Sequence, residues 1–149
     1  MQKTLFILLA LLLLCTPVWA AEGLVTVKSN HSVAKTADRL EKIIQKKGMT
    51  LFARIDHTAG AKKAGKQLAP TQVLVFGNPK IGSVLMACSQ SMGIDLPQKM
   101  LVYKDAKSQV WLAYNAPKYL AKRHGTRGCG AVLTKVQKAL AGFAKAAAK

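Results

Sequence analysis

The sequence lacks the motifs that mark most enzyme and cofactor sites. It contains no nucleophile–base pair, no phosphate-binding loop and no metal quartet at diagnostic spacing. Its histidines are scattered and none stands beside a cysteine, so a closed zinc or copper site is not expected. The sequence therefore predicts no metal and no cofactor, and it identifies no reaction by itself.

Acidic residues and stacking aromatics are also scarce. Aspartate and glutamate total 6 against 23 lysines and arginines, which gives a net charge of +17 at pH 7. The cations are spread along the chain without long blocks or interleaved aromatics, so nucleic acid is not an expected partner. Their excess favours anionic lipid, polysaccharide or an acidic protein. The charge alone is explained first by a soluble basic periplasmic protein whose lysines only face water, and functional attraction to such partners is the second interpretation.

Residues 1–20 have the pattern of a secretory signal peptide. Lys3 precedes an apolar run that is too short to span a bilayer comfortably, and Ala20 ends a site that a signal peptidase can read. Cleavage after Ala20 would place the protein in the periplasm. Cys15 raises a lipoprotein alternative, although Leu14 stands where a lipobox has a small residue. With no second transmembrane segment, residues 21–149 are expected to form a single domain.

Two cysteines, Cys88 and Cys129, remain after cleavage. An even number of thiols in an oxidising compartment favours one disulfide. Helical spacing turns both side chains inward, so a bridge requires the two helix ends to approach within about 7 Å between α-carbons. The alternatives are two buried free thiols, or a redox or metal-binding role for which no Cys-x-x-Cys pair is present.

Hydrophobic periodicity predicts the order strand, helix, strand, strand, helix, two strands and then C-terminal helices. The helix that starts at Pro79 is expected to reach about Met92, with Val84, Leu85 and Cys88 on its buried face. By strand parity, His57 belongs to the apolar face of its strand. The expected strands are 24–28, 49–57, 73–76, 98–104 and 109–114, and the other expected helices start at Val33, Pro117 and near Cys129, with 58–66 as a short exposed helix or loop.

The order of these elements predicts an α+β fold. Neighbouring strands without crossover helices between them imply an antiparallel or mixed sheet. We therefore expect a two-layer sandwich in which helices pack on one face of the sheet.

Several ordered motifs carry a resemblance to a known family. They are Phe76-Gly77-Asn78-Pro79-Lys80-Ile81-Gly82, Ile94-Asp95-Leu96-Pro97, Val110-Trp111-Leu112-Ala113-Tyr114-Asn115 and Tyr119-Leu120-Ala121-Lys122-Arg123-His124, with Arg54-Ile55-Asp56-His57 upstream. In these motifs the chain resembles the bacterial domain-of-unknown-function 302 family over roughly residues 24–140. The resemblance implies a β-α-β(4)-α core, extra short helices and a homodimer, but no activity. Ala116 departs from the aspartate expected there, which could cap a helix or bind a ligand.

The candidate site is placed where strand ends and helix starts could converge. A helix start offers oriented N–H groups, so the amides after Asn78, together with Lys80, would suit a small anionic molecule. Each residue also has a structural interpretation: helix capping, solvent exposure, turn bracing, core packing or a bond to a loop carbonyl. The predicted ligand-binding residues are His57, Asn78, Lys80, Asp95 and Tyr114.

Two functions remain open from the sequence. We predict a periplasmic, homodimeric, non-enzymatic binding or accessory protein for a small anionic ligand or an anionic envelope surface. The alternative is a small-molecule enzyme in which His57 performs acid–base chemistry with Asp95 or Tyr114. A closed pocket with His57 in hydrogen-bond reach of either partner would favour the enzyme.

Overall fold

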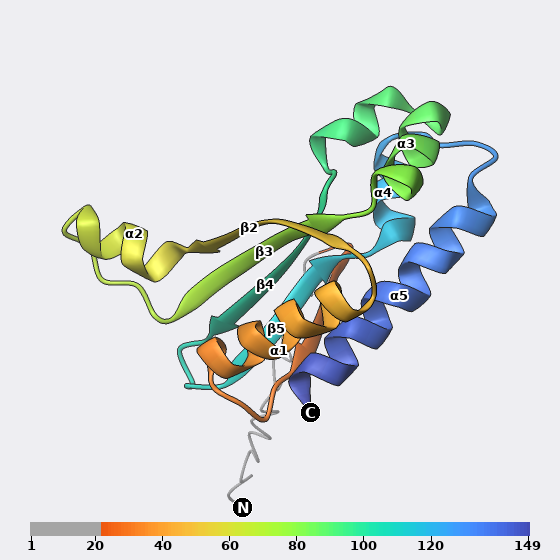
Figure 1. Cartoon of the computed structure of the whole chain (residues 1–149). Helices are drawn as coiled ribbons and strands as arrows, with labels where there is room; N and C mark the ends of the chain where they lie inside the picture. Colours follow the sequence, from red (N-terminus) through yellow and green to blue (C-terminus); the bar gives the residue numbers. More distant parts are fainter. Residues whose placement is uncertain (1–21) are drawn as a thin grey trace, which may run out of the picture.

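A computed structural model of the chain describes residues 22–149, and the expected signal peptide with its cleavage site lies outside the described residues. Helices α1 (Val33–Lys46) and α5 (Gly130–Ala148) cover one face of an antiparallel sheet (Figure 1). The sheet has the order β1-β5-β4-β3-β2, with every neighbouring pair antiparallel. The strands are β1 (Leu24–Lys28), β2 (Thr50–Asp56), β3 (Thr71–Gly77), β4 (Gln98–Lys104) and β5 (Val110–Asn115). The predicted α+β sandwich is confirmed, and the sheet is antiparallel rather than mixed.

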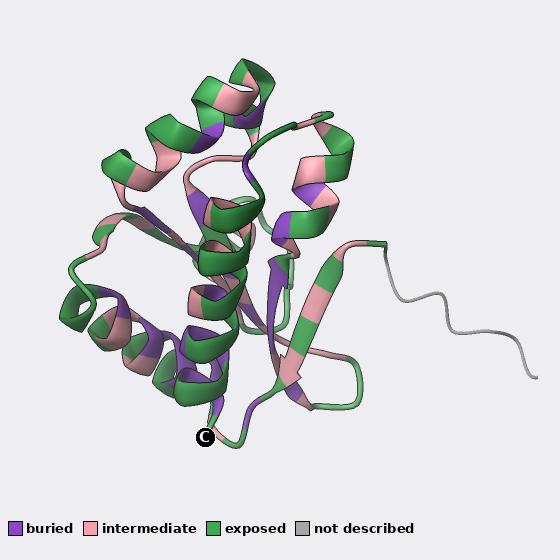
Figure 2. Ribbon diagram, turned by 90° about the vertical axis from the view of Figure 1, so that its right-hand side faces the viewer, coloured by how far each residue is buried: buried purple, intermediate pink, exposed green. Residues whose placement is uncertain are grey.

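The hydrophobic core lies between the sheet and these two helices. Phe76 and Leu112 of the sheet are fully buried, as are Leu40 and Ile44 of α1. Phe143 of α5 packs against Phe76 with ring centroids 6.2 Å apart, a usual separation for an aromatic pair. Figure 2 shows the helices banded into buried and exposed stretches, as amphipathic helices are.

The opposite face of the sheet is also apolar but less buried. Side chains alternate along a strand, so Leu101 and Tyr103 point away from the core into which Val102 is packed. Val73 and Trp111 lie beside them on the paired strands and are likewise half-buried. Ile55 at the edge is 45% exposed. The sandwich therefore has one face packed by helices and one that retains exposed apolar surface.

A smaller layer sits at one end of the sheet. It consists of α3 (Pro79–Cys88), the 3₁₀ helix η1 (Gln90–Ile94) and α4 (Pro117–Arg123), packed on the start of α5 around a second apolar cluster (Figure 1). A disulfide joins Cys88 to Cys129, whose α-carbons are 6.4 Å apart, so the predicted bridge is confirmed. Helix α2 (His57–Lys63) has no buried residue and is the short exposed helix that the sequence predicts.

Two local predictions are wrong. The helix from Pro79 ends at Cys88 rather than near Met92, because Ser89 is extended and its hydroxyl donates to the carbonyl of His124 at 3.0 Å. Val84, which was predicted on the buried face of this helix, is 44% exposed. His57 does not lie on the apolar face of β2 but begins α2 as an exposed residue.

The reason for the second error is helix capping. The carboxylate of Asp56 accepts from the amide of Ala59 at 3.0 Å, so Asp56 acts as the N-cap and ends the strand before parity can apply to His57.

Removing the disulfide should destabilise the fold. Cys88→Ser combined with Cys129→Ser is expected to lower the free energy of unfolding by about 2–4 kcal/mol, because the bridge closes a long loop in the unfolded chain. Urea unfolding followed by circular dichroism measures the change. Dithiothreitol should destabilise the native protein but leave the double variant unaltered. Identical urea midpoints for the oxidised native protein and the double variant would contradict the prediction.

Candidate functional site

The structure separates the predicted site residues. Thr50 pairs with Gly77 and Asp56 pairs with Gln72, so His57 and Asn78 leave opposite ends of the β2–β3 pair. At a strand rise of about 3.3 Å per residue, those ends are roughly 20 Å apart. Only Asn78, Lys80 and Asp95 lie in the smaller layer with α3 and η1. The expected convergence around His57 is not found.

The start of α3 is a completed helix cap rather than an open anion site. The side-chain oxygen of Asn78 accepts from the amide of Lys80 at 3.0 Å, and its backbone carbonyl accepts from Ile81 and Gly82 at 2.9 Å each. Pro79 has no N–H to offer. The amides that the sequence suggested for a ligand therefore donate within the helix itself, and the side chain of Lys80 is exposed.

Tyr114 is a core residue. It is 5% exposed and belongs to the main hydrophobic cluster between the sheet and α1. Burial raises the pKa of its phenol above the ordinary value of 10.0, so the hydroxyl stays protonated at physiological pH. Tyr114 therefore packs in the hydrophobic core, which agrees with the structural interpretation of this residue.

Asp95 has a histidine partner, but the partner is His124. Atom Nε2 of His124 lies 2.6 Å from Oδ2 of Asp95, and Nδ1 lies 2.9 Å from the hydroxyl of Ser91. Arg123 approaches the other carboxylate oxygen of Asp95 at 3.6 Å. The side chains of His124 and Asp95 are only 6% and 13% exposed. Sequence reasoning missed His124, although it closes the fourth motif of the family resemblance.

This network connects elements rather than forming an open reaction centre. The residue types Ser91, His124 and Asp95 match those of an acyl-transfer triad. None of the three is among the residues that line the groove described below, and His124 is nearly enclosed. The contacts instead tie η1 to the end of α4, reinforced by the bond from Ser89 to the His124 carbonyl. We assign the network a positioning role.

Within residues 22–149, no group of three or more histidine, cysteine, aspartate or glutamate side chains is arranged to hold a metal ion. Over the same residues, no helix has the length and hydropathy that a membrane span requires.

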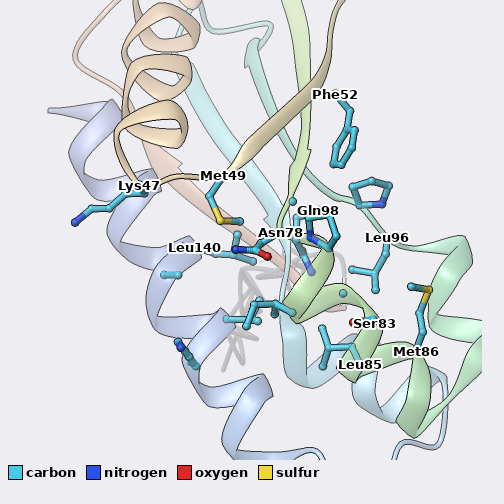
Figure 3. A pocket seen from close by; sticks show the side chains of 18 of the residues that line it. Lys47, Met49, Phe52, Asn78, Ser83, Leu85, Met86, Leu96, Gln98 and Leu140 are labelled. Carbon is cyan, nitrogen blue, oxygen red and sulfur yellow. The ribbon is translucent and has the colours of Figure 1, made fainter.

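A groove of about 740 Å³ opens beside α3 and was not predicted from the sequence (Figure 3). One wall is α3 and the other is the middle of α5, with the end of α1 and the starts of β2 and β4 between them. Of the predicted site residues only Asn78 lines it. The lining is largely apolar and comprises Lys47, Met49, Phe52, Gly77, Asn78, Pro79, Ile81, Gly82, Ser83, Leu85, Met86, Gly93, Leu96, Pro97, Gln98, Lys135, Val136, Ala139, Leu140 and Phe143.

All six aspartate and glutamate side chains are engaged by nearby groups. Arg54 binds two of them, Asp38 at 2.7 Å and Glu41 at 3.0 Å. Another, Asp105, accepts from the indole N–H of Trp111 at 2.8 Å, which lowers the pKa of that carboxyl group. The remaining contacts are Glu22 with Lys122, Asp56 with the Ala59 amide, and Asp95 with His124.

These contacts leave most of the positive charge without a carboxylate partner. In the described part of the chain, only Arg54, Lys122 and Arg123 among the lysines and arginines form ion pairs. We call the exposed outer sides of α1 and α5 the lysine face. It carries Lys35, Lys42, Lys46, Lys138 and Lys145.

Comparison with known proteins gives a family and a fold. A family model described as "Domain of unknown function DUF302" matches residues 25–143. A crystal structure titled as an uncharacterized conserved protein DUF302 from Bacillus stearothermophilus superposes with a TM-score of 0.76 at 19% identity, covering 87% of this chain and 100% of that one. At this identity, the likeness supports the fold alone.

Curated relatives carry a functional name. Proteins named "Fluoride-specific ion channel FluC 1" from Brucella suis and Brucella abortus are each 49% identical to this chain over 102 residues. The match covers 68% of this chain but only 40% and 38% of those proteins. The chain therefore spans about two-fifths of the length of the curated relatives it matches.

The contributions of His124 and His57 to the stability of the fold can be compared with one alanine variant of each. His124→Ala should lower the free energy of unfolding by about 2–3 kcal/mol, because it leaves the carboxylate of Asp95 largely buried without its closest partner. His57→Ala is the matched control and should cost less than about 0.5 kcal/mol, since His57 is exposed. Urea denaturation of both variants measures the difference. Equal costs would contradict the assignment.

Proposed function

The chain belongs to the DUF302 family of domains of unknown function, which assigns no activity. We propose that the mature protein is an exported, non-enzymatic accessory domain that binds an anionic membrane surface. The observation that carries the proposal is the lysine face. Every aspartate and glutamate side chain is held in a contact with another group, and none forms an ion pair with a lysine of this face.

The arrangement of the lysine face suits a broad anionic partner. Helices α1 and α5 pack side by side on one face of the sheet (Figure 1). The lysines of both helices that form the lysine face are exposed to solvent. A lysine near an anionic bilayer surface contributes about 1 kcal/mol of attraction. Several lysines on one face therefore supply enough attraction for reversible binding without any bilayer-spanning helix.

The relatives give independent support for a membrane setting. The matching segment in the Brucella proteins is part of a longer chain that is named an ion channel. An ion channel operates in a membrane, so the counterpart of this domain is covalently tethered to one. For the present protein we infer that the lysine face provides a membrane contact by charge attraction after export.

A small anion is a second candidate ligand, which the name of those relatives favours. The geometry around Asn78 supports it less well, because the N–H groups at the start of α3 already donate within the helix. The acid–base enzyme centred on His57 has no geometric support, since Asp95 pairs with His124 and Tyr114 is packed in the core.

Self-association is proposed for the opposite face of the sheet. Copies of so basic a chain repel one another through their lysine faces. The half-buried apolar face around Val73, Leu101 and Trp111 avoids this repulsion and would leave both lysine faces exposed. Leu101→Glu should then convert a dimer to a monomer in sedimentation velocity, whereas Lys107→Glu, on the exposed β4–β5 turn, should not. An unchanged dimer in Leu101→Glu would contradict this interface.

Vesicle binding tests the proposed function. Residues 21–149 should co-sediment with vesicles of phosphatidylglycerol and phosphatidylcholine but not with phosphatidylcholine alone, and added salt should release the protein. Replacing Lys42, Lys46, Lys138 and Lys145 with glutamine should weaken binding by about 100-fold or more. The matched control replaces Lys62, Lys63, Lys66 and Lys107, which are exposed on α2, just after it and on the β4–β5 turn. Equal losses in the two variants, or salt-insensitive binding, would refute the lysine face as the contact.

A further inference from the structure

The groove beside α3 has the size of a small-molecule site. Its volume of about 740 Å³ falls within the range of pockets that enclose one ligand. It lies between α3 and α5, which the disulfide joins near one end, so its two walls are fixed relative to each other. A groove with braced walls can hold a ligand without a large rearrangement of the chain.

The apolar side chains that are exposed in the groove favour a ligand with a long apolar part. Phe52 is 52% exposed and Met86 is 37% exposed, although both are large and apolar. In Figure 3 these two side chains and Leu96 lie on one side of the groove, with Asn78 and Gln98 between them and Lys47. Covering such surface stabilises a complex by about 25 cal/mol per Å² removed from water.

The polar groups of the groove call for an anionic end on that ligand. Gln98 is only 9% exposed, and no hydrogen bond among the described residues engages its side-chain amide. Asn78 uses its side-chain oxygen in the α3 cap, which leaves its NH₂ group as a donor. The charged residues in the lining are Lys47 and Lys135, and it contains no carboxylate. Amide donors and lysine ammonium groups, with no carboxylate among the lining residues, are complementary to the carboxylate of a ligand.

We propose that this groove binds a free single-chain fatty carboxylate of about the length of laurate. The carboxylate accepts from the amides of Asn78 and Gln98 within the field of the two lysines, and the alkyl chain lies along Phe52, Met86 and Leu96. The site is distinct from the lysine face, so the inference goes beyond the proposed membrane contact. It commits to a soluble fatty acid rather than to a lipid held in a bilayer.

Isothermal titration calorimetry with laurate below its micelle concentration tests the site in the protein of residues 21–149. Laurate should bind with one-to-one stoichiometry, dodecanol should bind more weakly, and acetate should not bind. This order follows because only laurate supplies both the chain and the charge. Dodecanol binding as tightly as laurate, or no laurate binding, would overturn the proposal.

Matched variants locate the binding to the groove. Lys135→Gln should weaken laurate binding by about 2–5-fold, whereas Lys138→Gln, exposed on the same helix outside the groove, should change it less than about 2-fold. Gln98→Leu should lower the ratio of laurate to dodecanol affinity by about 10-fold. Ala139→Phe should fill the groove and reduce binding by about 10-fold or more, and Ala141→Phe, exposed on α5, is its control.

Further outcomes separate this site from the other surfaces. The four-lysine variant that loses vesicle binding should keep its affinity for laurate, so failure of one proposal leaves the other intact. Thermal unfolding of each variant confirms that the protein is folded. Equal binding by Ala139→Phe and Ala141→Phe would place laurate outside the groove. Dissociation of a dimer by Ala139→Phe, without an effect on laurate, would assign the groove to a second copy of the chain and overturn the proposal.

Discussion

The structure depends on burying one face of the antiparallel sheet under α1 and α5. Fully buried side chains such as Leu40, Phe76 and Leu112 meet in that layer, and apolar burial of this kind is the main favourable term in folding. The same packing turns the polar sides of both helices to solvent. With so few carboxylates in the chain, those sides become a cationic surface as a direct consequence of the fold.

The smaller layer depends on contacts between residues distant in sequence. The disulfide joins the end of α3 to the start of α5, and Asp95 with His124 joins the end of η1 to the end of α4. Both links tie the segment between β3 and β4 to the segment that follows β5. The disulfide holds the end of α3 against the start of α5, and side chains of both helices line the groove between them.

Local patterns in the sequence were sufficient for the elements but not for the site. Period-two strands, the amphipathic α1 and the Asn78-Pro79 helix start depend on near neighbours, so they could be predicted together with the α+β class. The contact between Asp95 and His124 spans 29 positions and leaves no periodic signal. The early end of α3 likewise depends on a bond from Ser89 to a distant carbonyl. His57, which the sequence suggested as the partner of Asp95, instead begins α2 because Asp56 caps that helix.

Helix α5 shows how one element can serve two surfaces. Val136, Leu140 and Phe143 turn toward the groove and core, and Lys135 stands at the margin of that stripe, while Lys138 and Lys145 project from the outer side. A helix rotates by about 100° per residue, so Lys135 and Lys138 lie roughly 60° apart around its axis. The two lysines can therefore act on different ligands. A domain held on a membrane by Lys138 would keep its groove open at the edge of that contact, where a single-chain carboxylate leaving the bilayer could enter.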